Sequence, residues 1–146
     1  MTQTKPSLLV EVEDLHKSYP LPESGHVSVL NGATFSLENG STLAITGYSG
    51  SGKSTLLALL AGLDSPDRGR ITIKGIALTG MDEGSLTRFR AAHLGIVFQQ
   101  FHLLPHLTAE ENIRLPLELQ GRSYHPESIA LLLSQVGLSE RGNHLP

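Results

Sequence analysis

The sequence predicts a mixed α/β fold in which strands come first, α/β units follow and helices end the chain. Residues 8–15 alternate apolar and acidic side chains, the pattern of a half-buried strand. Residues 41–46 form a compact apolar run, typical of a buried central strand, and a glycine-rich stretch and strong helix formers follow. Near the end, the spacing of one helix face recurs at Ile129, Leu132, Leu133 and Val136.

Length and composition exclude several classes of protein. The 146 residues suit one domain, and 39% hydrophobic and 17% charged residues are ordinary for a soluble globular chain. The net charge of -3 is not the basic surplus that grips nucleic acid, so no nucleic-acid partner is expected. The N-terminus lacks a signal-peptide core, and the longest apolar run, from Leu56, is too short to cross a bilayer. We expect a cytoplasmic chain whose membrane link comes through a partner.

The remaining elements of the first two thirds follow in order. Residues 27–30 and 34–37 predict two short strands, and a turn follows at residues 38–40. Residues 53–61 predict a helix that ends at Gly62, and residues 70–75 alternate like a surface strand. Asp82 can cap a helix that runs to about His93, with Leu86 and Phe89 facing inward. Residues 94–98 read as a second buried strand.

Two helices are predicted in the last third. Residues 108–111, with Thr108 and Glu111 three apart, form a capping box that opens a helix toward Leu115. Pro126 suits the first turn of a last helix, which Gly137 closes.

Residues 47–54, "GYSGSGKS", match the phosphate-loop pattern G-x-x-x-x-G-K-[ST]. Glycines let backbone N–H groups face phosphates without an obstructing Cβ, Lys53 brings a positive charge, and Ser54 offers a hydroxyl to Mg²⁺. A flexible Gly/Ser turn is the alternative, but a strand leading in and a helix leading out favour the phosphate loop. The residues expected to hold the phosphates are Gly47, Ser49, Gly50, Ser51, Gly52, Lys53, Ser54 and Thr55.

Three segments in order carry a family resemblance. "LHKSYP" contains Tyr19, the phosphate loop follows, and "LGIVFQQFHLLPHLTAEENIRLPLEL" comes after it. Together they resemble the ATP-binding subunits of ABC transporters, most of all the lipoprotein-release and macrolide-export subgroup. The resemblance implies a P-loop NTPase fold of ABC type, with ATP and Mg²⁺ as cofactors. Residues 1 to about 98 would form an antiparallel β subdomain and the P-loop core, and residues from about 99 to 146 the Q-loop and the start of the helical subdomain.

The resemblance also implies roles for single residues. Tyr19 would stack on adenine, although a packed tyrosine at a strand end is the alternative. Gln99 would act in catalysis by touching Mg²⁺ and the attacking water, so that Ser54 and Gln99 are the metal ligands. A plain polar residue at a strand end is the alternative for Gln99, and Gln100 is a weaker candidate for its role.

Partners follow from the resemblance as well. Residues 101–120, from Phe101 to Gln120, would meet a transmembrane permease subunit, and the ATPase subunits would form a homodimer on the cytoplasmic face of the inner membrane. A core segment is the alternative reading of the apolar "FHLLPHL". His102 and His106 have metal-ligand spacing for a helix, but Pro105 between them argues against one, so a metal site is discounted.

Hydrolysis of ATP needs more than a phosphate loop. An acidic residue at the end of a second buried strand holds Mg²⁺ in such enzymes, and no acidic residue after Thr55 has that place. The family's Ser-Gly-Gly signature and later histidine are also not among the 146 residues. We therefore expect a truncated ABC ATPase domain that binds ATP at most; the alternative is a non-hydrolytic nucleotide- or partner-binding remnant. A GTPase would need a guanine-type "NKxD", which the sequence lacks.

Overall fold

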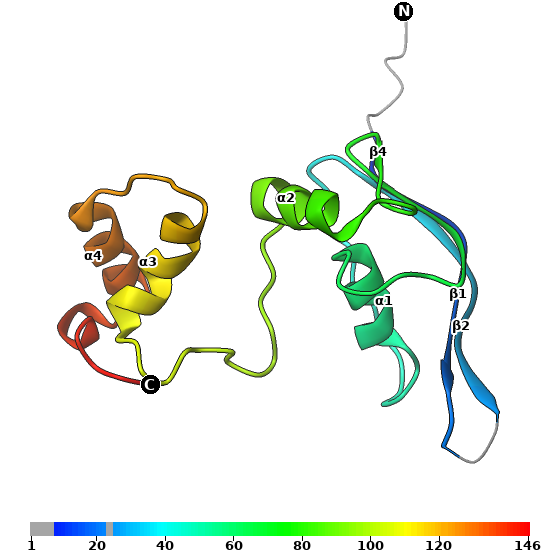
Figure 1. Ribbon diagram of the computed structural model, residues 1–146, viewed down its shortest axis with the longest axis horizontal. Helices are drawn as coiled ribbons and strands as arrows, with labels where there is room; N and C mark the ends of the chain where they lie inside the picture. Colours follow the sequence, from blue (N-terminus) through cyan, green and yellow to red (C-terminus); the bar gives the residue numbers. More distant parts are fainter. Residues whose placement is uncertain (1–7, 23–24) are drawn as a thin grey trace, which may run out of the picture. The chain divides into compact units, whose positions relative to one another are not determined.

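The computed structural model describes residues 8–22 and 25–146. The chain forms two compact units, which are described separately below: one reaches as far as Gly95, and the other runs from Ile96 to Pro146 (Figure 1).

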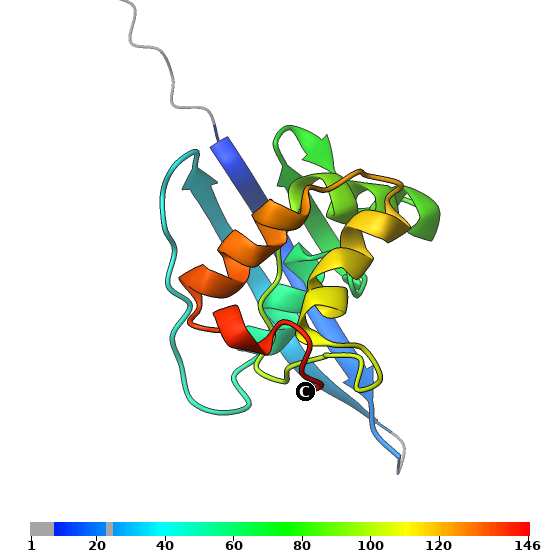
Figure 2. The same cartoon turned by 90° about the vertical axis from the view of Figure 1, so that its left-hand side faces the viewer.

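The first unit is built on a four-stranded antiparallel sheet of order β2-β1-β3-β4. Its strands are β1 (Leu8–Pro20), β2 (His26–Glu38), β3 (Arg68–Ile73) and β4 (Ile76–Ala77). The long strands β1 and β2 run side by side in both views (Figure 1 and Figure 2). Strand β1 has a partner on each edge, and its side chains Val12 and Leu15, which belong to the core cluster, are almost completely buried. The predicted strand at residues 8–15 is confirmed and continues to Pro20.

The two strands predicted at residues 27–30 and 34–37 form the single strand β2, so their separation was wrong. Leu15 of β1 pairs with Ala33 of β2, but the next residue, His16, pairs with Asn31. Gly32 is therefore an extra residue in a β-bulge, and its φ of +79° is a left-handed conformation that glycine adopts without strain. Pairing continues on both sides of the bulge.

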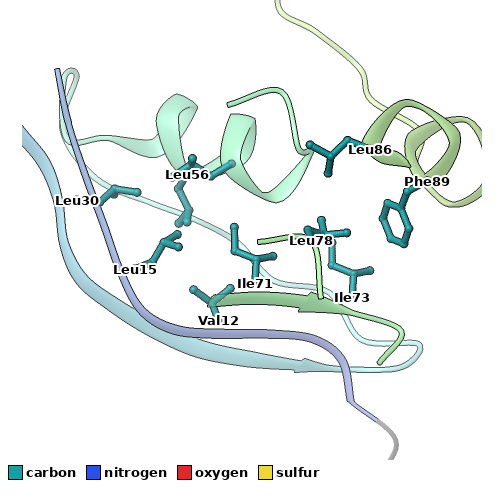
Figure 3. Packing of buried hydrophobic residues seen from close by; sticks show 10 residues of the cluster. Val12, Leu15, Leu30, Leu56, Ile71, Ile73, Leu78, Leu86 and Phe89 are labelled. Atoms are coloured by element: carbon teal, nitrogen blue, oxygen red, sulfur yellow. The ribbon is translucent and has the colours of Figure 1, made fainter. Parts of the chain in front are cut away.

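Helices α1 (Lys53–Leu60) and α2 (Glu83–His93) supply the apolar side chains that cover the sheet (Figure 3). Burying one such aliphatic side chain contributes about 1.5–3 kcal/mol. The buried cluster consists of Val12, Leu15, Leu30, Leu56, Leu59, Ile71, Ile73, Leu78, Leu86 and Phe89.

Both helix predictions in this unit are confirmed. Gly62, with φ +63°, follows the end of α1, and its N–H donates to the Leu59 carbonyl oxygen at 3.0 Å. The Asp82 carboxylate accepts from the Ser85 N–H at 2.9 Å and caps α2, whose Leu86 and Phe89 are buried.

Two predictions of buried strands are wrong. Residues 41–46 and 94–98 are not strands, and Leu43 is 45% exposed while Val97 is 99% exposed. A buried strand needs neighbours on both edges to satisfy its N–H and C=O groups, and no strand in the described part of the chain pairs with either segment. Each segment therefore remains unpaired and mostly exposed, with only Ile45 and Leu94 packed partly against the core.

The second unit is helical, with α3 (Ala109–Leu119) and α4 (Pro126–Gln135) side by side, followed by a short 3₁₀ helix, η1 (Ser139–Arg141) (Figure 2). The capping box is confirmed: the Thr108 N–H donates to Glu111 Oε2 at 2.7 Å, and the Glu111 N–H donates to Thr108 Oγ1 at 3.3 Å. The helix continues past the predicted Leu115.

Helix α4 begins at Pro126 as predicted, and Gly137 with φ +74° follows it. Of the four residues expected on its inner face, Ile129 and Leu133 are buried, but Leu132 is 48% and Val136 68% exposed. Helix α3 and the short η1 cover a narrower stripe of α4 than the periodicity predicted.

Candidate functional site

The glycine-rich loop leads directly into α1 in the first unit. Gly50 and Gly52 have φ angles of +78° and +87°, which side-chain-bearing residues adopt at a cost. A Cβ on Gly52 would lie 2.9 Å from the Val29 carbonyl oxygen, so packing against β2 requires glycine there. A Cβ on Gly50 would meet nothing within 4 Å, so the loop backbone is open to a ligand at that point.

The Lys53 ammonium is folded back onto this loop. Its Nζ donates to the carbonyl oxygens of Gly47 at 2.9 Å and Tyr48 at 2.7 Å, and it lies 3.4 Å from Ser51 Oγ. Carbonyl oxygens carry only partial negative charge, so the site keeps a net positive charge. The loop can therefore attract an anion.

The start of α1 adds to this positive field. Gly52 is the N-cap and has no side chain to cap the helix, and the first turn has no acidic residue. The first N–H groups of a helix have no partner within it, and the helix dipole favours an anion there. Ser54 is exposed in this first turn, next to the partly buried Thr55. The geometry of residues 47–55 thus suits the phosphate groups predicted for it.

Tyr19 lies near the end of β1, and its hydroxyl donates to Asp64 Oδ2 at 2.7 Å. The other Asp64 oxygen, Oδ1, accepts from Lys17 Nζ at 2.8 Å. Lys17 Nζ also donates to the Ser65 carbonyl oxygen at 2.7 Å and lies 5.0 Å from the centre of the Tyr19 ring. Tyr19 is thus held at its hydroxyl and approached by a cation at its ring.

The contacts among Asp64, Tyr19 and Lys17 shift the pKa values of Asp64 and Tyr19. Burial acts to raise the pKa of Asp64, but hydrogen bonds from Lys17, Tyr19 and the Ser65 N–H lower that pKa overall. The hydrogen bond to Asp64 raises the pKa of Tyr19, burial adds to this rise, and a side-chain hydrogen bond with Thr55 opposes it. Tyr19 is therefore tied to the loop that follows α1.

Asp64 and Asp67 were not predicted as site residues from the sequence. Asp67 Oδ2 accepts from both the N–H and the hydroxyl of Ser18 at 2.6 Å, so the two aspartates bind the same stretch of β1. One signal was available: Lys17 and Tyr19 are two apart on a strand and share a face, and a lysine on an inward face needs a carboxylate.

Gln99 and Gln100 belong to the second unit, whereas Tyr19 and the glycine-rich loop belong to the first. Gln99 is exposed in a bend. The bend is closed by His102, whose ring lies 4.5 Å from that of Phe98 and whose Nδ1 is 2.8 Å from the Gln100 carbonyl oxygen. Within its own unit, Gln99 is therefore presented to solvent by an ordered turn.

Residues 101–120 expose apolar side chains. Phe101 is 88% and Leu119 79% exposed, and Leu103 and Leu104 are partly exposed. Helix α3 has no buried residue. The exposure of Phe101, Leu103 and Leu104 disagrees with the alternative that "FHLLPHL" is a core segment. Asn112, which the sequence analysis did not single out, fixes this segment: it accepts from the Leu104 N–H at 2.9 Å and donates to nearby carbonyl oxygens.

Among the described residues, no helix is long and apolar enough to span a membrane, and no three His, Cys, Asp or Glu side chains gather as metal ligands.

Comparison with known proteins gives consistent results. The model of the family described as "ABC transporter" matches residues 30–146. The chain is 45% identical to the uncharacterized ABC transporter ATP-binding protein YbbA of Escherichia coli K12 over 140 residues, which cover 94% of the chain and 61% of YbbA. It is 38% identical to the macrolide export ATP-binding/permease protein MacB of Burkholderia pseudomallei, covering 94% of the chain and 21% of MacB.

A solved structure agrees with the fold. The ATP-binding cassette MJ0796, described as a dimer in a post-hydrolysis state bound to ADP and Pi, superimposes with a TM-score of 0.83 at 33% identity. The match covers 94% of this chain and 61% of the other. The chain thus spans about three fifths of the length of YbbA and of MJ0796. The likeness confirms the predicted α/β fold of an ABC ATPase cassette, present here in part.

Proposed function

The chain belongs to the ABC transporter family, and we propose that it is an ATP-binding subunit whose glycine-rich loop holds the phosphates of ATP. One observation carries this proposal: the Lys53 ammonium lies over a loop whose backbone is open at Gly50 and which runs directly into an uncapped helix N-terminus. Glycines, a cation and a helix start together are what a phosphate group requires.

The residues present fit both ATP and Mg²⁺. Phosphate oxygens would replace the carbonyl oxygens of Gly47 and Tyr48 as acceptors for Lys53, and a charged acceptor binds an ammonium more strongly. Mg²⁺ takes oxygen ligands and is usually bound with substrate phosphates and water. The exposed Ser54 hydroxyl would be its ligand from the first unit. The bound ion would neutralise part of the phosphate charge.

The remaining site residues keep the roles expected from the resemblance. Tyr19 would stack on adenine, which suits a ring fixed at its hydroxyl and only partly buried. Gln99 would contact Mg²⁺ and the attacking water, which its exposed position in the second unit permits. The first unit would be the β subdomain and P-loop core, and the second the Q-loop and helical part.

We infer that the 146-residue chain binds ATP and does not hydrolyse it. No described acidic residue after Thr55 ends a strand of the sheet. The two nearest in sequence, Asp64 and Asp67, are engaged by Lys17, Tyr19 and Ser18. These residues therefore supply neither an acidic Mg²⁺ ligand nor a carboxylate to polarise the attacking water, and hydrolysis needs both.

A non-hydrolytic partner-binding role is the second candidate, and the exposed apolar segment 101–120 supports it.

The proposed partner is a transmembrane permease subunit that docks on residues 101–120 at the cytoplasmic face of the inner membrane. The exposure of Phe101 and Leu119 supports this, because large apolar side chains on a surface mark sites of interaction. The proposed activity of the whole transporter is export or lipoprotein extraction, which rests on the subgroup resemblance and the similarity to MacB. A dimer of ATPase subunits is proposed by analogy with MJ0796.

Calorimetric titration with Mg²⁺-ATP tests the binding proposal. We expect wild-type chain to bind, Lys53→Ala to lose at least about tenfold in affinity, and Arg70→Ala, which removes an exposed charge on β3, to bind normally. Equal binding by Lys53→Ala and wild type would contradict the phosphate-loop assignment. Phosphate release by the wild type above the Lys53→Ala background would contradict the inference that the chain is inactive alone.

A fractionation experiment tests the partner. Phe101→Ser should lower the share of chain that sediments with membranes, whereas Leu21→Ser, at an exposed apolar position in the first unit, should not. Equal loss in both variants would show that general hydrophobicity, and not this segment, causes the association.

A further inference from the structure

We propose that Asp64 is a positioning residue for Tyr19 and thereby sets how well the chain distinguishes a nucleotide from a phosphate chain that carries no base. The proposal rests on the proposed function, because it takes Tyr19 as the aromatic that receives adenine. It goes further by assigning a role to a carboxylate outside both the phosphate loop and the aromatic position.

The contacts of Asp64 fix the direction of the Tyr19 ring. A tyrosine side chain turns about two torsions, and a hydrogen bond at the hydroxyl restrains χ1, which sets where the ring lies. The Tyr19 hydroxyl donates to Asp64 Oδ2 at 2.7 Å. Stacking requires the ring to lie where the base arrives, so a ring that is already held in position loses less freedom when a base binds.

The two carboxylate oxygens of Asp64 bind different partners, so the bond to Tyr19 does not compete with the bond to Lys17. Lys17 Nζ takes the other oxygen, Oδ1, at 2.8 Å and has a second acceptor in the Ser65 carbonyl oxygen at 2.7 Å. The ion pair with Lys17 in turn holds the carboxylate in place, and the Lys17 side chain is only 11% exposed. Lys17 therefore holds the Asp64 carboxylate in place, and Asp64 in turn holds the Tyr19 hydroxyl.

The same contacts link Tyr19 to the phosphate loop within one unit. Asp64, which accepts from the Tyr19 hydroxyl, lies in the loop directly after the end of α1. Helix α1 opens at the loop that holds Lys53. The helix thus determines both where the phosphates are held and where the aromatic ring lies.

The test compares Mg²⁺-ATP with Mg²⁺-tripolyphosphate, which offers phosphates without a base, by calorimetric titration of the whole chain. Tyr19→Phe keeps the ring and removes the hydroxyl, and it leaves the Lys17–Asp64 pair intact. Asp64→Ala removes the acceptor. Asp67→Ala is the matched control, because Asp67 bonds Ser18 from the same loop without touching Tyr19 in the hydrogen bonds described.

We expect Tyr19→Phe and Asp64→Ala each to weaken ATP binding by about three- to tenfold, the effect of one hydrogen bond, and to leave tripolyphosphate binding within about twofold. The double variant that combines Tyr19→Phe with Asp64→Ala should bind ATP no more weakly than Asp64→Ala alone, since both changes remove the same hydrogen bond. Asp67→Ala should leave the ratio of the two affinities unchanged.

Two results would overturn the proposal. If Asp64→Ala and Tyr19→Phe weaken the binding of both ligands equally, Asp64 has only a structural role. If neither variant weakens the binding of either ligand, the Tyr19–Asp64 bond does not position the ring for the base. Should Asp64→Ala fail to fold, Tyr19→Phe decides between these outcomes. Failure of the proposed function is recognised separately, because the wild type would then bind neither ligand or Lys53→Ala would bind both normally.

Discussion

Lys17 and Asp64 form a partly buried ion pair, with 2.8 Å between Lys17 Nζ and Asp64 Oδ1 and side chains that are 11% and 31% exposed. The pair joins the second half of β1 to the loop that follows α1. A charge removed from water is stable only when it is paired and hydrogen-bonded, and Lys17 has both the carboxylate and the Ser65 carbonyl oxygen.

Removing one partner of this pair should destabilise the first unit. We expect Asp64→Ala to lower the free energy of unfolding by about 2–3 kcal/mol, because it leaves a buried ammonium without its anion. Combining it with Lys17→Met should recover part of this loss, since the double variant leaves no buried charge. Urea denaturation followed by circular dichroism measures both values. A change below about 0.5 kcal/mol in Asp64→Ala would show that the pair is effectively exposed.

The same pair should make stability depend on acid pH. The pKa of Asp64 is lowered in the folded chain, so its contribution is fully present above the unfolded pKa of about 4 and is lost as pH falls through the folded pKa. We expect the loss of stability below about pH 4 to be shallower in Asp64→Asn than in wild type. Glu38→Gln, at an exposed position at the end of β2, is the control and should keep the wild-type slope. Thermal melting between pH 2 and 6 measures it, and identical slopes in Asp64→Asn and wild type would contradict the linkage.

Two glycines of the phosphate loop should respond differently to alanine. Gly50 and Gly52 both have left-handed φ angles, so each substitution carries a backbone cost of about 1–2 kcal/mol. Only the Cβ at position 52 would lie 2.9 Å from the Val29 carbonyl oxygen. We therefore expect Gly52→Ala to destabilise the first unit by at least about 1 kcal/mol more than Gly50→Ala. Equal midpoints of denaturation for the two variants would show that α1 shifts away from β2 at no cost.

The capping box should determine how well α3 is formed at its start. Thr108→Ala removes the acceptor for the Glu111 N–H and should cost about 1 kcal/mol, whereas Thr108→Ser keeps it and should be nearly neutral. The Ala109 and Glu110 N–H groups donate to the His144 and Gly142 carbonyl oxygens, so their protection reports the docking of the C-terminal segment. Hydrogen exchange of α3 amides measures the effect. If protection in Thr108→Ala equals that in Thr108→Ser, these backbone bonds and not the cap hold the helix start.

Elements whose cause is local were predicted well from the sequence. The cap at Asp82, the capping box at Thr108, the stop at Gly62 and the first turn at Pro126 depend on side chains within a few residues, and all four are confirmed. Elements that depend on neighbouring strands were predicted less well: the apolar runs at residues 41–46 and 94–98 are unpaired and mostly exposed in the described chain.

For the candidate site, the pattern from Gly47 to Thr55 was sufficient by itself to predict a phosphate loop before a helix, because each residue acts through its own backbone conformation or charge. The tertiary structure alone showed that Lys53 lies on the loop carbonyl oxygens and that Asp64 joins Lys17 to Tyr19. The two contacts of Asp64 connect residues of β1 with the loop that follows α1, more than forty residues further along the chain. The physical reason is that sequence spacing specifies local geometry, whereas the partner of a buried charge is chosen by which distant segments pack together.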